Sequence, residues 1–423
     1  MAETLYRSIR SISELCCCLS RTKFDDLTNS ERLQNIGVSN GARLTLVRSP
    51  SYILTASSDC TAKLWNPEQG ECLLTFRGHL APIQSAVFSP DAQQLLTASL
   101  DGTAKLWWVE SGACSFTFKP SAATLHIAAF SPDGKQVLTT DNISKISLWS
   151  SVSGERLISF GRPHAYVLIA FFSPNGEHVL EVSDDRSPRL WRAASGEWLA
   201  TFSGHDGRVN SAILSPDAQS LLTASADTTA KLWSVESREC LRTFDAHDNN
   251  VISAVFSANC EQILTAAVSF TVKVWSTKLG HCLLTIETQE GRLTLNSSVD
   301  FSSNSRQVLT SDNLKTRVWS TESGKCLFTF EDHTGPVTAA AFISDGKQVL
   351  TASTDKTAKL WSAVSGKCLL TFKGHDLFVT SVSVTRKSDF SKFHDRRALA
   401  QLWMDLSDLP GLQSKKLPES IVP

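Results

Sequence analysis

The segment "LLTASADTTAKLW" spans residues 221–233, and near copies of it occur at 95–107 ("LLTASLDGTAKLW") and 349–361 ("VLTASTDKTAKLW"). Each copy ends in a tryptophan, and this tryptophan recurs every 42 residues along the chain, with one interval of 44. The recurring positions are Trp65, Trp107, Trp149, Trp191, Trp233, Trp275, Trp319, Trp361 and Trp403. A fixed period of this length indicates a repeat protein, whose units bury their apolar faces by stacking.

Each repeat is predicted to form four short strands. In one unit these are "IQSAVF" (83–88), "QLLTAS" (94–99), "TAKLW" (103–107) and "CSFTF" (114–118), separated by turns rich in Pro, Asp and Gly. Four antiparallel strands cannot bury both faces alone, and a closed ring of such sheets leaves few open edges. The sequence therefore predicts an all-β protein, a closed β-propeller of four-stranded antiparallel blades.

The repeats resemble those of the WD40 family. The period, the terminal Trp and the "GH" openings at 77–79 ("RGH"), 203–205 ("SGH") and 373–375 ("KGH") match that family. The chain departs from the family name in one letter, because Trp is followed mostly by Ser and never by Asp. The resemblance covers about residues 51–403 and implies the propeller fold.

The resemblance also implies a structural network in each blade. In it the His of "GH" bonds an Asp in the turn between the second and third strands, and the bonding extends to a Ser or Thr and to the Trp. The residues expected to form it are His79, Asp101, Ser99 and Trp107; His205, Asp227, Ser225 and Trp233; His333, Asp355, Ser353 and Trp361; and His164, Asp185, Ser183 and Trp191.

A Ser/His/Asp set also suggests a hydrolase. A catalytic triad occurs once, whereas this set recurs at a fixed period and ends in an indole, which is a donor and not a nucleophile. We therefore interpret it as structural. The array is uneven, since one unit keeps His247 but has Ser269 where the others have Asp.

The number of blades depends on the two ends of the array. The first unit has Asp59 and Trp65 but lacks its His, and the last has His375 and a good first strand but lacks its Asp. If the C-terminal strand (378–384) joins the N-terminal blade, His375 meets Asp59 and eight blades result. The alternative is nine blades, with "ARLTLV" (42–47) and "RRALAQLW" (396–403) supplying the missing strands.

Composition divides the chain into three regions. Residues 1–50 form an N-terminal lead-in, of which 27–47 faintly resemble the last third of a ubiquitin-like domain; the alternative is an ordinary lead-in strand. Residues 51–385 are the predicted WD40 propeller. Residues 386–423 hold a degenerate last repeat and a polar tail. Cys16, Cys17 and Cys18 lie in the lead-in, and the sequence does not decide whether they are modified.

Charge and apolar content exclude several classes of partner. The net charge of −1 gives no electrostatic signal for nucleic acid. No apolar run reaches the roughly 18–20 residues of a membrane helix, and the N-terminus is a poor signal peptide, so we expect a cytoplasmic protein. No metal or cofactor motif occurs. Six cysteines follow a Trp by seven residues, and we expect reduced, small apolar strand residues there.

We expect a non-catalytic scaffold that binds other proteins, acting as a monomeric propeller within a larger complex. By resemblance, partners dock on the rim with the "GH" loops, and the residues that suit contact there are Tyr166, Arg208, Leu377 and Phe378. Two alternatives stay open. One is a substrate-recruiting subunit of a ubiquitin-related complex, based on the N-terminal resemblance. The other is an enzyme with a site at the channel mouth.

Overall fold

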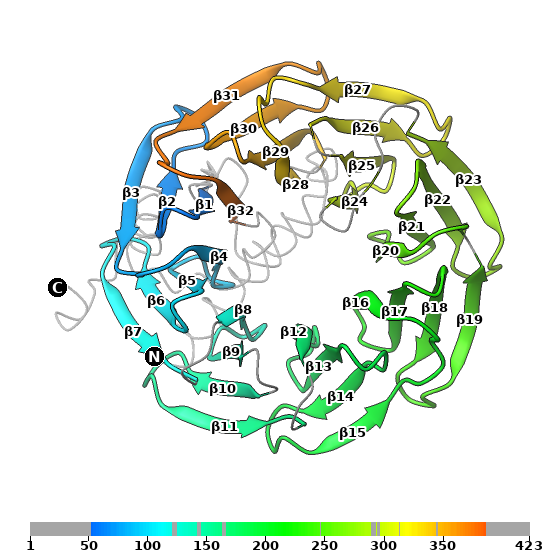
Figure 1. Ribbon diagram of the computed structural model, residues 1–423, viewed down its shortest axis with the longest axis horizontal. Coiled ribbons are helices and arrows are strands. Elements are labelled where there is room, and N and C mark those ends of the chain that lie inside the picture. Colours follow the sequence, from blue (N-terminus) through cyan, green and yellow to red (C-terminus); the bar gives the residue numbers. More distant parts are fainter. Residues whose placement is uncertain are drawn as a thin grey trace, which may run out of the picture. The chain divides into compact units, whose positions relative to one another are not determined.

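A computed structural model describes residues 52–385, apart from 121–124, 142–144, 163–165, 246, 289–292, 294–296, 313 and 344–345. In this part of the chain, eight antiparallel four-stranded sheets follow one another around a ring (Figure 1). The sheets are called blades 1 to 8. In each blade one strand lies nearest the centre, and the fourth lies on the circumference.

The blades follow the order of the chain. Blade 1 contains β32 (Val379–Val384), β1 (Ile53–Ser57), β2 (Thr61–Trp65) and β3 (Cys72–Arg77). Blade 2 contains β4 (Ile83–Phe88), β5 (Gln94–Ser99), β6 (Ala104–Trp108) and β7 (Cys114–Phe118). Blade 3 contains β8 (Leu125–Phe130), β9 (Gln136–Asp141), β10 (Ile146–Ser150) and β11 (Arg156–Phe160). Blade 4 contains β12 (Val167–Phe172), β13 (His178–Ser183), β14 (Arg189–Arg192) and β15 (Trp198–Thr201).

The second half of the ring repeats the pattern. Blade 5 contains β16 (Val209–Leu214), β17 (Ser220–Ser225), β18 (Thr229–Ser234) and β19 (Cys240–Asp245). Blade 6 contains β20 (Val251–Phe256), β21 (Gln262–Ala267), β22 (Thr271–Ser276) and β23 (Cys282–Glu287). Blade 7 contains β24 (Val299–Phe301), β25 (Gln307–Ser311), β26 (Thr316–Ser320) and β27 (Cys326–Phe330). Blade 8 contains β28 (Val337–Ile343), β29 (Gln348–Ser353), β30 (Thr357–Ser362) and β31 (Cys368–Lys373).

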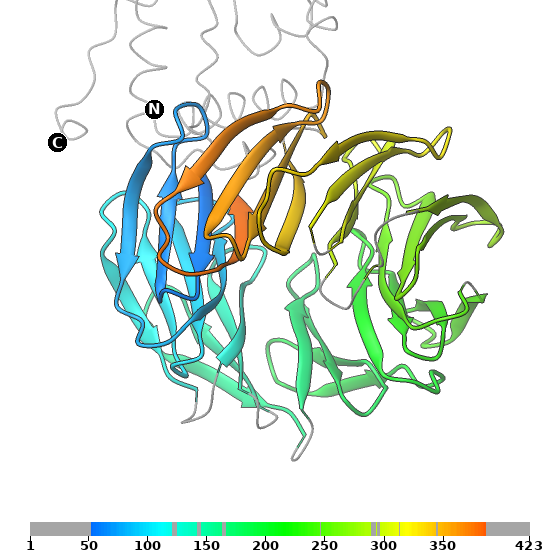
Figure 2. The same ribbon diagram turned by 45° about the horizontal axis from the view of Figure 1, so that its top comes forward.

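The ring closes through strands from the two ends of the array. β32 lies beside β1 and pairs with it antiparallel (Figure 2). In this pair Ile53 lies opposite Val384. The side chain of Thr380 then reaches the next blade, where its hydroxyl donates to the carbonyl of Ile83 at 2.7 Å. The prediction of eight blades with this closure is confirmed, and the nine-blade alternative is wrong, because β32 occupies the edge of β1 that a separate strand would need.

The core lies between neighbouring blades. The two middle strands of each blade are mostly buried, and completely so in β1 and β2, whereas the inner strand is partly buried and the outer strand is largely exposed, as in β4 and β3. One apolar cluster fills each contact between blades; at the closure it joins Leu350 and Phe372 of blade 8 to Ile53 and Trp65 of blade 1. The conserved spacing of the repeat therefore positions every Trp against the preceding blade.

Candidate functional site

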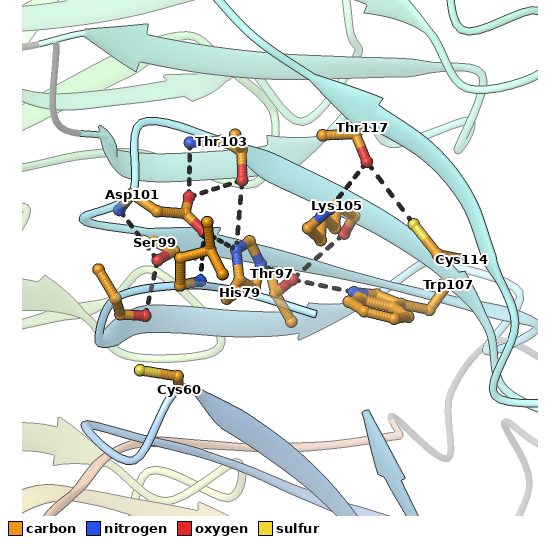
Figure 3. A network of polar contacts seen from close by, with 12 residues as sticks. Cys60, His79, Thr97, Ser99, Asp101, Thr103, Lys105, Trp107, Cys114 and Thr117 are labelled. Carbon is orange, nitrogen blue, oxygen red and sulfur yellow. Dashed lines mark hydrogen bonds and ion pairs between the residues drawn. The ribbon is translucent and has the colours of Figure 1, made fainter. Parts of the chain in front are cut away.

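A buried polar network crosses blade 2 from its rim to its tryptophan (Figure 3). Asp101 Oδ2 lies 2.8 Å from His79 Nδ1, and His79 Nε2 lies 2.7 Å from the hydroxyl of Thr97. Trp107 Nε1 donates to the same hydroxyl at 2.9 Å. With Nδ1–H donated to the carboxylate, the neutral ring accepts from Thr97 through Nε2. Thr103 donates to Asp101 Oδ1 at 2.6 Å and so holds the carboxylate in place.

Blades 1, 5 and 8 contain the same network. Blade 5 forms it from His205, Asp227, Thr223 and Trp233. Blade 8 forms it from His333, Asp355, Thr351 and Trp361. In blade 1 they are His375, Asp59, Thr55 and Trp65, so the network joins residues more than 300 positions apart, and His375 Nδ1 lies 2.8 Å from Asp59 Oδ2. The closure is thus held by side chains as well as by the strand pair.

The structure corrects the hydroxyl that sequence analysis placed in the network. The hydroxyl of Thr97, and not that of Ser99, accepts the hydrogen bond from the indole of Trp107 and is hydrogen-bonded to His79. Ser99 accepts instead from the amide of Asp101 at 3.1 Å and donates to the carbonyl of Ala81 at 2.9 Å. Ser225 and Ser353 accept from the amides of their aspartates in the same way. The serines therefore shape the turn, while the threonines link histidine to tryptophan.

The environment sets the charge of this network. Burial opposes ionisation of Asp101, but hydrogen bonds from Thr103, the Leu80 amide and His79 outweigh it and lower its pKa to about 2. The pKa of Asp227 is lowered to about 2 in the same way. Burial lowers the pKa of His79, and the neighbouring carboxylate only partly offsets this. A carboxylate next to a neutral imidazole is therefore the state of the network near neutral pH.

Blade 6 keeps the histidine but lacks the carboxylate. His247 Nε2 lies 3.0 Å from the hydroxyl of Thr265, which also accepts from Trp275 at 2.8 Å. At the position of the aspartate, Ser269 lies 3.0 Å from the hydroxyl of Thr271. Burial lowers the pKa of His247 to about 4, a larger fall than in blades where a carboxylate opposes it.

Blade 4 replaces the histidine network with charged side chains. Trp191 Nε1 donates to Glu181 Oε2 at 2.7 Å, and the guanidinium of Arg189 forms an ion pair with Asp185 and lies 3.9 Å from Glu181. Glu181 is fully buried and Arg189 is nearly so. Hydrogen bonding and charge from Arg189 outweigh the effect of burial and lower the pKa of Asp185. His164, predicted to join Asp185, Ser183 and Trp191, lies outside the described residues.

Blades 3 and 7 retain only part of the network in the described residues. In blade 3, Trp149 Nε1 donates to Thr139 at 2.8 Å. In blade 7, Trp319 Nε1 donates to Thr310 at 2.9 Å, while Arg317 pairs with Asp312. The tryptophan-to-acceptor bond is therefore common to all eight blades, and the groups beyond it vary.

The repeated network is suited to packing and not to catalysis. Thr97 is completely buried and its oxygen is already bonded to two groups, so a substrate cannot reach it. Within the described ranges, no cluster of three or more His, Cys, Asp or Glu side chains could hold a metal ion. A buried, satisfied polar network of this kind rigidifies a fold and fixes its register.

The four residues predicted for partner binding lie on one rim of the ring. This rim, called the His-loop rim, carries the loops that join the outer strand of one blade to the inner strand of the next. Tyr166, Leu377 and Phe378 are 39%, 46% and 50% exposed, and Arg208 is also exposed. Leu377 and Phe378 belong to blade 1, whereas Tyr166 and Arg208 belong to blades 4 and 5. The structure thus separates them into two groups.

Leu80 on the same rim was not among the predicted residues. It follows His79, its backbone amide donates to Asp101 Oδ2 at 2.9 Å, and its side chain is 90% exposed. The amide of the residue after the histidine also donates to the aspartate in blades 1, 5 and 8, so this backbone contact is a shared feature of the intact networks.

The remaining predictions concern the cysteines, the membrane and the chain ends. The six cysteines seven residues after a Trp are free thiols opposite that Trp, and all but Cys368 are exposed, more than expected for apolar strand residues. Across the described ranges no helix has the length and apolar character to cross a bilayer. The ubiquitin-like resemblance, Cys16–Cys18 and the C-terminal tail lie outside the described residues.

Comparison with known proteins agrees with this geometry. Residues 70–107, 196–234, 238–276 and 324–362 match the WD40 family profile, described as WD domain, G-beta repeat. No curated protein matches the chain. Among solved structures, the computationally designed protein Ika8 is similar in fold, with a TM-score of 0.64 and 22% identity over 75% of this chain and 98% of that one. The chain therefore contains four WD40 repeats within the eight blades of its propeller, which is consistent with a WD repeat protein.

Proposed function

We propose that this propeller is a non-catalytic scaffold that binds partner proteins on the His-loop rim. The observation that carries the proposal is the exposure of large apolar side chains on the two neighbouring blades at the closure. Leu80 of blade 2 is 90% exposed, and Leu377 and Phe378 of blade 1 are 46% and 50% exposed. Large apolar side chains exposed on a surface are candidates for contact with a partner protein.

The backbone holds these side chains outward. The amide of Ser58 donates to the carbonyl of Phe378 at 2.9 Å, and the hydroxyl of Ser57 donates to that of Leu377 at 3.3 Å. The amide of Leu80 is likewise fixed on Asp101. A partner would therefore meet a preformed surface and would pay little ordering entropy. We call Leu80, Leu377 and Phe378 the seam patch.

Tyr166 and Arg208 form the second group proposed for partner contact. The carbonyl of Tyr166 accepts from the amide of Asp184 at 3.1 Å, and that of Arg208 accepts from the amide of Ala226 at 2.8 Å. Both side chains are exposed on neighbouring blades, and Tyr and Arg are enriched among residues that dominate binding energy.

The test is affinity purification of the full chain followed by mass spectrometry. One variant changes the seam patch to Ala (Leu80→Ala, Leu377→Ala, Phe378→Ala), and a second changes Tyr166 and Arg208. The matched control changes the exposed apolar residues of the opposite rim, Val152, Leu279 and Val364, to Ala. We expect partners to be lost from the first variant and retained by the control. Loss in the control alone would place binding on the opposite rim.

The proposal includes a cytoplasmic location and one propeller acting within a larger complex. Five free cysteines stand exposed on the outer strands: Cys72, Cys114, Cys240, Cys282 and Cys326. Exposed free thiols persist in a reducing compartment, which supports this assignment. Cell fractionation and size-exclusion chromatography of the purified chain and of the extract test both parts, and a chain found only in an oxidising compartment would contradict the first.

A further inference from the structure

In most blades a lysine of the third strand covers the surface between this strand and the outer strand. Lys231, two residues before Trp233, extends to the outer strand and donates to Thr243 at 2.9 Å. Lys63 and Lys105 make the same bond in blades 1 and 2. Lys273 and Lys359 lie over the rings of Trp275 and Trp361, at 5.9 and 5.8 Å from the ring centroids.

Blade 4 departs from this arrangement at two positions. Arg189 occupies the lysine position, but its guanidinium turns to Asp185 and Glu181. Trp198 occupies the position opposite Trp191 that is a cysteine in six blades, and its Nε1 donates to Ala200 O at 3.0 Å and Thr201 Oγ1 at 3.2 Å. Thr201 is thus bonded to an indole, whereas the equivalent threonine in blades 1, 2 and 5 accepts a hydrogen bond from a lysine.

An open cleft results at the outer edge of blade 4. Its volume is about 590 Å³, within the range of ligand-binding pockets, and its lining includes Trp191, Trp198, Thr201, Arg189 and Arg162. Trp198 is 60% exposed, whereas Trp191 is only 6% exposed. The walls are therefore mainly apolar, and an indole forms one side.

The mouth of the cleft carries a positive group. Arg162 Nη1 donates to Asp185 Oδ2 at 3.0 Å, and 54% of the arginine side chain remains exposed. A guanidinium has five N–H groups and binds carboxylates in a bidentate geometry. Asp185 is shared by Arg162 and Arg189, and Glu181 lies 3.9 Å from Arg189, so the exposed guanidinium of Arg162 is the group at the mouth that can bind an anionic ligand.

We propose that this cleft binds a peptide segment of a partner protein, in which a large apolar side chain inserts between Trp191 and Trp198 and an adjacent Asp or Glu binds Arg162. Aromatic stacking on the exposed indole and a charge-assisted hydrogen bond would anchor the segment. The site is separate from the seam patch, because its residues belong to blade 4 and to the loop before it, whereas the seam patch lies on blades 1 and 2. It therefore does not depend on the function proposed for the rim.

The test uses a random heptapeptide library displayed on phage and selected on the immobilised full chain. Selected phage are then measured on Trp198→Cys and Arg162→Gln. The first variant introduces the residue that six blades already carry opposite their tryptophan, so it is expected to fold, and thermal melting checks this. Trp108→Ser is the matched control, since Trp108 is an exposed indole on blade 2 and five other units have Ser there.

We expect peptides with Phe, Trp or Leu next to Asp or Glu to be enriched. Their binding should fall by about tenfold or more on Trp198→Cys, as for removal of a central aromatic contact, and should be unchanged on Trp108→Ser. Arg162→Gln should remove the preference for the acidic residue. Enrichment of basic peptides, absence of any enriched motif, or equal binding to Trp198→Cys would overturn the proposal.

Discussion

Blades 4 and 5 are neighbours in the ring, and each buries a tryptophan whose indole N–H requires an acceptor. In blade 5, the acceptor is the hydroxyl of Thr223, which is linked through neutral His205 to Asp227. In blade 4, the acceptor is the carboxylate of Glu181, and Arg189 supplies the balancing charge. The same backbone register therefore accommodates either a mostly neutral network or a charged one.

The two solutions differ in what happens when one member is removed. A neutral network loses hydrogen bonds, whereas a buried charged network is left with an uncompensated charge, which is far more costly. The charged network also turns Arg189 toward Asp185, whereas Lys231, at the same position of blade 5, extends to Thr243 on the outer strand. The charged core network of blade 4 is thus accompanied by a different outer surface on the same blade.

The largest expected effect is that of Arg189→Leu in blade 4. Glu181 and Asp185 would lose their shared cation, and breaking a buried pair typically costs about 3–5 kcal/mol. The matched control is Lys231→Leu at the same position of blade 5, which removes only an exposed hydrogen bond to Thr243 and should change stability by about 0.5 kcal/mol or less. Denaturant midpoints measure both changes in stability. Equal losses of stability in the two variants would contradict the larger cost expected for breaking the buried ion pair.

The architecture could be predicted because it depends on the periodicity. A Trp at intervals of 42 residues, with one of 44, defines the blade, and complementary deficits at the two ends favour the closure over nine blades, since His375 lacks an Asp and Asp59 lacks a His within its own unit. These features are local in sequence or depend on counting, so they need no knowledge of side-chain geometry.

The composition of the network could be predicted only in part. Thr97 and Ser99 both carry hydroxyls and lie two residues apart on one strand face, so the pattern cannot say which one the histidine reaches; the loop that carries His79 decides this. Glu181 did have a signal, since the other seven blades have Thr as the acceptor at its position. The exposure of Leu80 depends on the path of its loop, which periodicity does not specify.

An intermediate effect is expected for Thr223→Val in blade 5. Valine keeps the shape but removes the oxygen that binds Trp233 Nε1 and His205 Nε2. Leaving a buried donor unsatisfied costs about 1–3 kcal/mol, so the loss should fall below that of Arg189→Leu. Thr243→Val is the control, because Thr243 is exposed and bonds only surface groups. A loss as small as that of the control would mean that the indole finds another acceptor.

The smallest expected effect is a gain, from completing the network of blade 6. Ser269→Asp would place a carboxylate where blade 5 has Asp227, and Ala267→Ser, introduced with it, would supply the hydroxyl that holds the amide of that aspartate in blade 5. A new buried hydrogen bond of this kind contributes about 0.5–1.5 kcal/mol at pH 7. Ser269→Asn, with the same serine, is the neutral control.

Acidification should separate this variant from its control. Burial lowers the pKa of His247 to about 4, while the unfolded chain takes up the proton near 6.5. The neutral ring therefore stabilises the fold fully above pH 6.5, and this contribution is lost as the pH falls toward 4. A carboxylate at position 269 raises the folded pKa, so less is lost, and the advantage of the Asp variant over the unmodified chain should grow between pH 7 and pH 5. The Asn variant should show a constant difference. If the two variants behave alike across this range, the carboxylate of the intact blades acts only as a hydrogen-bond acceptor and its charge does not stabilise the histidine.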